Sequence, residues 1–256
     1  MKTFRSIAIL LGAVALASCD KNAVQDITGS LPGARIKFFN FGVNAPQVNF
    51  YANATKMTAI TSATGVESTL GVGYGSVGAG GFYSALTPGQ YTFAGRIAAT
   101  VDKDLVVSTV PSTLADGKSY SFYMSGFYDA TAKTVEGFVV EDPYVSALDF
   151  TVAYVRFVNA ISNSSPMTMY ARNTTTLAEV AIGAAVAYKS AGVFMAVPNG
   201  VYDLSTRLAG VTTNAIARTA VSLSAGKVYT ISARGDMTVV STTATNRPFL
   251  DNTANR

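Results

Sequence analysis

The chain has 256 residues, with 19 lysine and arginine side chains against 15 aspartate and glutamate side chains, and it contains no histidine. Acid–base catalysis by histidine and metal binding by histidine are therefore both excluded. The basic residues are scattered rather than clustered, which argues against a nucleic-acid partner. The length accommodates two domains, and the abundance of Ala, Thr, Ser, Gly and Val favours short strands and tight turns over long helices.

The N-terminus has the pattern of an export signal. Lys2 and Arg5 precede an uncharged apolar run over residues 7–17. A membrane-spanning helix needs about 20 apolar residues, so this run is too short to cross a bilayer and fits the apolar region of a signal peptide. We therefore expect residues 1–18 to be removed on export.

The signal ends in the sequence LASC, whose last residue, Cys19, is the only cysteine of the chain. This ending resembles the bacterial lipobox, in which the cysteine is diacylated before the signal is cleaved. The alternative is an ordinary secretory signal that happens to contain a cysteine. The resemblance implies lipidation of Cys19 and a polar tether over residues 19–33. Each buried methylene contributes about 0.8 kcal/mol, so two or three acyl chains anchor a protein stably without a spanning helix.

The lone cysteine also bounds the chemistry and the location of the protein. It excludes a disulfide within the chain, and its acylation removes the only thiol nucleophile. Asp20, directly after the cysteine, resembles the inner-membrane retention signal of enteric bacteria. That rule does not hold in all phyla, and we expect an outer-membrane lipoprotein. The sequence leaves open whether the protein faces the periplasm or the cell surface.

The rest of the chain carries a long-period repeat. Three segments occur twice in the same order: ARIKFFN at 34–40 and AYVRFVN at 153–159, PGQY at 88–91 and PNGVY at 198–202, ADGKSY at 115–120 and SAGKVY at 224–229. Self-similarity at this spacing indicates two copies of one folded unit. We expect the copies to span residues 34–146 and 151–249, followed by a polar tail over 250–256.

Short apolar stretches between Gly, Pro and Asp turn signals predict the strands. Beyond the two opening strands of the first copy, they lie at 68–74, 81–86, 90–96, 105–110, 119–127 and 134–140. No convincing amphipathic helix interrupts them. Strands at this regular spacing predict an all-β fold, with two tandem Ig-like antiparallel β-sandwich domains behind the signal peptide.

The paired motifs resemble a bacterial family of exported proteins and lipoproteins known as domain of unknown function 4397. Its opening strand, its Pro-containing turn with a following tyrosine, and its later "L-x-A-G-x-x-Y-T" strand match the second copy well, the last at residues 223–230. The first copy departs from the pattern in a longer region over 55–80. Where many members have histidine after the first strand, this chain has Asn40 and Asn159. The resemblance implies one such domain in each copy and supplies no catalytic residues.

Two patterns hint at ligands, and neither meets the requirements of its site. The segment GYGSVG at 73–78 matches the dinucleotide motif G-x-G-x-x-G, but no helix start follows and no acid occurs before Asp102. We read it as a hairpin loop. The acids at 102 and 104 and at 141 and 142 are too isolated for calcium, which takes six to eight oxygen ligands. We therefore expect no cofactor and no metal.

Aromatic side chains are the best surface candidates in the sequence. Six of them could form a platform for sugar rings or for a protein partner, namely Tyr74, Phe82, Tyr83, Tyr123, Phe127 and Tyr128. The competing interpretation is that they are core residues or cross-strand pairs, as aromatic residues in strands usually are.

These observations lead to a functional hypothesis without catalysis. We expect a lipid-anchored protein of the cell envelope that acts as a structural or interaction module, with an envelope protein or a glycan as partner. The alternative is a surface carbohydrate-binding module. A weaker alternative is a glycosidase-like enzyme with two carboxylates, although no two of the 15 acids form such a pair in the sequence. The sequence indicates no oligomeric state.

Overall fold

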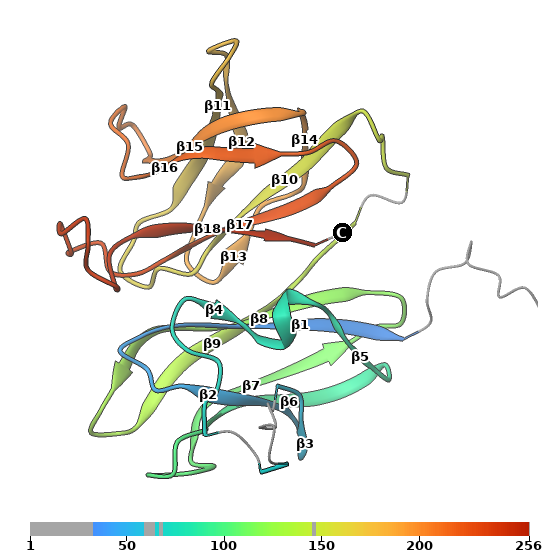
Figure 1. Ribbon diagram of the computed structural model, residues 1–256, viewed down its shortest axis with the longest axis vertical. Helices are drawn as coiled ribbons and strands as arrows, with labels where there is room; N and C mark the ends of the chain where they lie inside the picture. Colours follow the sequence, from blue (N-terminus) through green and yellow to red (C-terminus); the bar gives the residue numbers. More distant parts are fainter. Residues whose placement is uncertain (1–32, 59–64, 67–68, 145–146, 256) are drawn as a thin grey trace, which may run out of the picture. The chain divides into compact units, whose positions relative to one another are not determined.

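The computed structural model describes residues 33–58, 65–66, 69–144 and 147–255. The signal, Cys19 and the rest of the tether up to residue 32 lie outside these residues. The described chain folds into two β-sandwiches, each of two sheets, which Figure 1 shows in blue to green and in yellow to red. The predicted fold class is confirmed. Among the described residues, no helix is long and apolar enough to cross a membrane.

The first sandwich contains the strands β1 to β9. One sheet has the order β4-β1-β8-β9, with β5 also paired to β1, and the other has the order β3-β2-β6-β7. The strands are β1 (Ala34–Val43), β2 (Val48–Ala52), β3 (Thr55–Lys56), β4 (Ser76–Val77), β5 (Ser84–Leu86), β6 (Gly89–Ile97), β7 (Val106–Leu114), β8 (Ser119–Asp129) and β9 (Thr134–Glu141).

The second sandwich repeats this arrangement. One sheet has the order β13-β10-β17-β18, with β14 also paired to β10, and the other has the order β12-β11-β15-β16. The strands are β10 (Val152–Asn159), β11 (Met167–Asn173), β12 (Glu179–Val186), β13 (Ser190–Ala191), β14 (Met195–Pro198), β15 (Gly200–Leu208), β16 (Ile216–Leu223), β17 (Val228–Arg234) and β18 (Phe249–Ala254).

Each sandwich departs from a purely antiparallel pattern at one place. The opening strand pairs in parallel with the strand that follows the third repeated motif: β1 with β8, and β10 with β17. The other strand pairs of the described sheets are antiparallel. The opening strand is thus paired on both sides inside its sheet.

Equivalent side chains make the same contacts in both sandwiches. Tyr91 and Tyr202 each donate their hydroxyl to the carbonyl oxygen four residues earlier, at 2.8 Å. The buried amides of Asn40 and Asn159 each accept the backbone N–H two residues ahead, at 3.3 and 3.0 Å. A buried amide satisfies the backbone at the end of each opening strand, and this explains why asparagine occurs there twice.

The opening strands are buried on both faces. Ile36 and Phe38 point into the core of the first sandwich, whereas Phe39 and Phe41 belong to a separate apolar cluster shared with the second sandwich. A strand with one face in solvent shows alternating apolar and polar residues. Because β1 is covered on both faces, its residues do not alternate cleanly.

The shared cluster joins the inner sheets of the two sandwiches. It contains Phe39, Phe41, Tyr123, Phe138, Val158 and Ala160. The ring of Tyr123 stacks on Phe39 at 4.6 Å and on Phe138 at 5.1 Å between centroids, and its hydroxyl shares a 3.2 Å hydrogen bond with Ser232. Burial of this face packs the two sandwiches against each other rather than leaving them as independent domains.

Two predictions about strand positions are wrong. Within the predicted strand 68–74, the described part makes only an isolated bridge, between Val72 and Val48. The predicted polar tail over 250–256 instead contains β18, which pairs along β17. Polar residues occur in β18 because Leu250 alone reaches the core of the sandwich, while neighbouring side chains lie beside the first sandwich or solvent.

Candidate binding site where the two sandwiches meet

A buried ion pair lies between the sandwiches. The carboxylate of Asp142, just after β9, accepts a hydrogen bond from the guanidinium of Arg156 on β10, and both side chains are fully buried. Arg156 also donates to the hydroxyl of Thr230 at 3.0 Å and to the carbonyl of Glu141 at 2.8 Å. Its guanidinium lies 4.8 Å from the ring centre of Phe194. The cation is therefore satisfied on all sides, as a buried charge must be.

The second carboxylate oxygen of Asp142 is also occupied. It accepts hydrogen bonds from the hydroxyls of Ser121 at 2.8 Å and Tyr83 at 2.6 Å. Tyr83 is hydrogen-bonded to Tyr144 as well. Burial, followed by the nearby charge of Asp142, raises the pKa of Tyr83 well above its ordinary value, so the phenol remains a neutral donor. Asp142 thus has a structural role and no oxygen left for a metal.

The other acids considered for calcium, and set aside as too isolated, are also paired. Asp102 binds Lys133 at 2.7 Å, and Glu141 binds Lys118 at 2.8 Å. Asp104 accepts a hydrogen bond from the hydroxyl of Tyr51 at 3.1 Å. Among the described residues, no group of three or more acidic or thiol side chains is placed to hold a metal ion.

Lys37 is a second buried cation, at the position of β1 that corresponds to Arg156 in the repeat. Its ammonium donates to the carbonyl of Ala254 at 2.8 Å and to the side chain of Asn255 at 3.4 Å, and it lies 4.4 Å from the ring centre of Tyr83. Burial lowers the pKa of Lys37 to about 8, with Asp142 opposing the shift and Arg156 adding to it. The chain end of the second sandwich is thereby tied to the first strand of the first.

The lowered pKa of Lys37 predicts a pH-dependent stability. Between pH 8 and 10 the unfolded chain holds the lysine proton and the folded chain has released it, so stability rises with pH, by up to about 1.4 kcal/mol per pH unit. Above pH 10 the trend reverses, because tyrosines such as Tyr83 and Tyr144, whose pKa burial raises, ionise only in the unfolded chain.

Urea unfolding from pH 7 to 10 tests this expectation. In Lys37→Met the rise in stability between pH 8 and 10 should disappear, because the titrating group is gone. Lys118→Met, at an exposed lysine, should keep the rise. Parallel pH profiles for the natural protein and Lys37→Met would show that the buried ammonium keeps an ordinary pKa.

A pocket of about 500 Å³ opens beside this buried network. Its walls come from β1, from the segment around β4 and the turn at Gly78–Gly81, and from the C-terminal residues after Asp251. The lining residues are Lys37, Val77, Gly80, Gly81, Phe82, Tyr83, Asn252, Thr253, Ala254 and Asn255. Its size and mostly apolar wall with a few polar groups are those of a small-molecule site.

The six aromatic candidates have different environments. Phe82 and Tyr83 line the pocket together, and Phe82 is 77% exposed. Tyr123 is fully buried between the sandwiches and contributes to no surface. The others occur elsewhere: Phe127 is 44% exposed at the end of β8, Tyr128 packs against the core of the first sandwich, and Tyr74 lies 4.9 Å from the guanidinium of Arg234. The structure therefore does not join all six into one platform.

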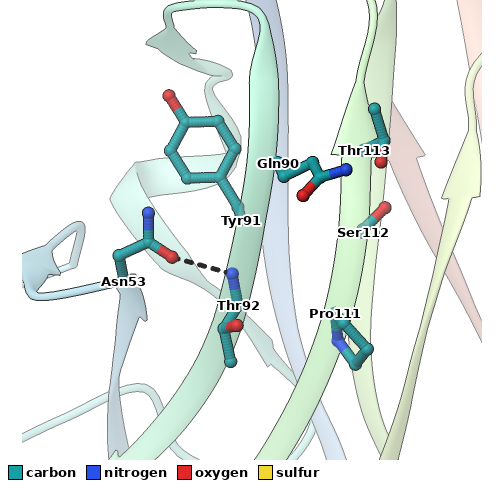
Figure 2. Close-up of a pocket in the computed structure, with 7 residues that line it drawn as sticks. All are labelled: Asn53, Gln90, Tyr91, Thr92, Pro111, Ser112 and Thr113. Carbon is teal, nitrogen blue, oxygen red and sulfur yellow. Dashed lines mark hydrogen bonds between the residues drawn. The ribbon is translucent and has the colours of Figure 1, made fainter.

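A second hollow, of about 640 Å³, lies over β6 and β7 of the first sandwich. Figure 2 shows its seven lining residues, with Gln90 and Tyr91 on one strand and Ser112 and Thr113 on the next. Asn53 accepts the backbone N–H of Thr92 at 2.8 Å, drawn as a dashed line in Figure 2. The hollow is polar and shallow, and no carboxylate lines it.

The glycine-rich segment 73–78 forms β4 and leads into the turn at Gly78–Gly81. Gly75 has φ of 75°, and a side chain there would collide with Arg234, which explains the glycine. No α-helix opens at this segment, so the dinucleotide motif lacks its structural context, as the sequence analysis predicted.

Sequence reasoning missed Lys37, Arg156 and the C-terminal residues of the site. A signal was present: a charged residue occupies the middle of each opening strand, between apolar neighbours, at matching positions of the repeat. Such a residue is either exposed or buried with a partner. The sequence alone does not say that Asp142, from the segment between the copies, is that partner.

A family model matches the second sandwich. Residues 153–256 match the model of a family described as Domain of unknown function (DUF4397). No curated protein matches the chain.

Proposed function

We propose that the second sandwich is a DUF4397 domain and that the first sandwich is a further copy of this domain. The support is the repeated sequence motifs, the identical order of strands in both sandwiches, and the paired hydrogen bonds of Tyr91 and Tyr202. The longer 55–80 region of the first copy accounts for its weaker match to the family pattern. Insertions of this kind are tolerated in surface connections.

This protein acts as a non-catalytic structural or interaction module of the cell envelope. The observation that carries the proposal is that the buried charged side chains make structural contacts. Asp142, Arg156 and Lys37 all hold the two sandwiches together. A catalytic acid must instead face a substrate, and no acid lines either of the two hollows described above.

Assays on envelope polymers test the absence of catalysis. Purified protein should release no product from peptidoglycan or from surface polysaccharides. Hydrolysis that persists through purification and disappears on substitution of one carboxylate would overturn the proposal and favour the glycosidase-like alternative. That alternative requires two carboxylates about 5–10 Å apart in an open cleft.

The envelope location rests on the lipobox at Cys19. In Cys19→Ala we expect the protein to leave the membrane fraction for the soluble fraction, because the acyl chains supply the anchor. Fractionation followed by immunoblotting measures this. Membrane association that survives the substitution would show that the anchor is something other than the lipid.

Protease treatment of intact cells then distinguishes the two faces of the membrane. Digestion would place the sandwiches on the cell surface and favour adhesion or glycan capture. Protection until the envelope is opened would place them in the periplasm and favour a scaffold.

A second candidate function is carbohydrate binding. The polar hollow over β6 and β7 favours it, because the amide of Gln90 and the hydroxyls of Ser112 and Thr113 line it together (Figure 2). The ring of Tyr91 lies on the other side of β6 from Gln90. Amides and hydroxyls that share one hollow can bond the hydroxyl groups around the edge of a sugar ring. Binding on a glycan array tests this function, and silence across the array would reject it.

A further inference from the structure

The pocket between the sandwiches has the features of a ligand site, and its chemistry narrows the ligand. Phe82 is 77% exposed at the pocket although its neighbour Tyr83 is half-buried and hydrogen-bonded. An exposed aromatic ring beside a mostly apolar concave wall offers its face to a ligand that enters the pocket. The open ring therefore points to a ligand with an apolar face.

The charge of the pocket excludes an ionic ligand. The ammonium of Lys37, its one ionic group, is buried and already donates to Ala254 and Asn255. No carboxylate lines the wall to attract a cation. The ammonium keeps one further N–H, but Lys37 is only 1% exposed, so a charged ligand would lose its hydration without reaching an exposed charge of opposite sign. The ligand is therefore neutral.

The polar groups of the pocket suit hydroxyls. Thr253, on β18, lines the pocket together with Asn255, the residue that follows β18, and within the described chain the hydroxyl of Thr253 makes no hydrogen bond. Gly80 and Gly81 have φ of 64° and 85° and bring bare backbone to the wall, without side chains to cover its N–H and carbonyl groups. An apolar wall with hydroxyl and peptide groups at its edge fits a ring that is apolar on its face and polar around its rim.

We propose that this pocket binds a single neutral sugar ring, with Phe82 under the apolar face of the ring and Thr253 among the groups that bond its hydroxyls. The inference deepens the second candidate function, on which it rests, by giving it a site other than the hollow over β6 and β7. It does not depend on the lipid anchor.

Ligand-observed saturation-transfer NMR on the purified full-length chain tests the site. The probes are the methyl glycosides of glucose, galactose and mannose, N-acetylglucosamine, and phenol as a non-sugar ring. We expect saturable transfer to at least one sugar, with an affinity that falls at least tenfold in Phe82→Ala. Phe150→Ala removes a phenylalanine of equal exposure, 75%, that does not line the pocket, and should leave binding unchanged.

The remaining outcomes distinguish the proposed pocket from carbohydrate binding elsewhere on the protein. Sugar binding that survives Phe82→Ala and is lost in Gln90→Ala would place the sugar in the hollow over β6 and β7; carbohydrate binding would stand and the present site would be wrong. Transfer to phenol alone, or to none of the probes, would overturn the proposed ligand. The folded state of each variant is checked by its thermal unfolding midpoint.

Discussion

Asp142→Ala is expected to lower the free energy of unfolding by about 3–5 kcal/mol. The substitution leaves the guanidinium of Arg156 fully buried without its anion, and it also removes the acceptor for Ser121 and Tyr83. Removing one partner of a buried ion pair costs far more than the pair contributes, because the remaining charge stays desolvated. Urea unfolding at pH 7 measures the loss.

The double variant Asp142→Leu with Arg156→Met is the control. It removes both charges and fills the space, so most of the lost stability should return. Ser121→Ala, which removes only one hydrogen-bond donor, should cost about 1 kcal/mol. A loss of less than 1 kcal/mol in Asp142→Ala would mean that water reaches the pair and that it does not clamp the sandwiches.

Tyr123→Ala is expected to uncouple the two sandwiches. The side chain is fully buried between them, stacked on Phe39 and Phe138, and its truncation leaves a cavity worth about 3–5 kcal/mol. In the natural protein we expect one calorimetric transition, since the shared cluster couples the cores. In Tyr123→Ala the endotherm should separate into two.

Tyr123→Phe separates the ring from the hydroxyl. It removes only the hydrogen bond shared with Ser232, so it should cost about 1 kcal/mol and keep the single transition. Two transitions in the natural protein would show that the sandwiches already unfold independently. A single transition with an unchanged midpoint in Tyr123→Ala would show that the shared cluster is loosely packed around Tyr123.

The β-sandwich class could be predicted from the sequence because strands and turns are encoded locally. Turn signals such as Asp116-Gly117 and the repeated motifs mark strand ends within a few residues of their positions in the structure. β18 could not be predicted in this way. It is an edge strand, and its polar residues Asn252 and Thr253 line the pocket beside the first sandwich, so its sequence NTA resembles a polar tail.

The binding site was less accessible to prediction than the fold, because it depends on which sheet faces meet. Phe82 and Tyr83 were identified as candidates from their aromatic character. Lys37 lies beside Tyr83 within the first sandwich, but Thr253 joins them only where the second sandwich packs against the first. Tyr123 belonged to the same sequence-based set and is instead buried at that contact. Side chains of one type differ in role here because tertiary contacts, not local pattern, decide their exposure.

The parallel pairing of β1 with β8 has a kinetic consequence. At the start of this pair the backbone N–H of Gly33 donates to the carboxylate of Asp116, 83 residues further along the chain. Until β8 has been synthesised, β1 can pair only with the two residues of β4 and the three residues of β5. The entropy cost of closing this long loop is met before the contacts between β1 and β8 can stabilise it, and this slows folding. A nascent chain delivered N-terminus first therefore carries β1, apolar on both faces, as an unprotected aggregation-prone strand until residue 119 and beyond have emerged.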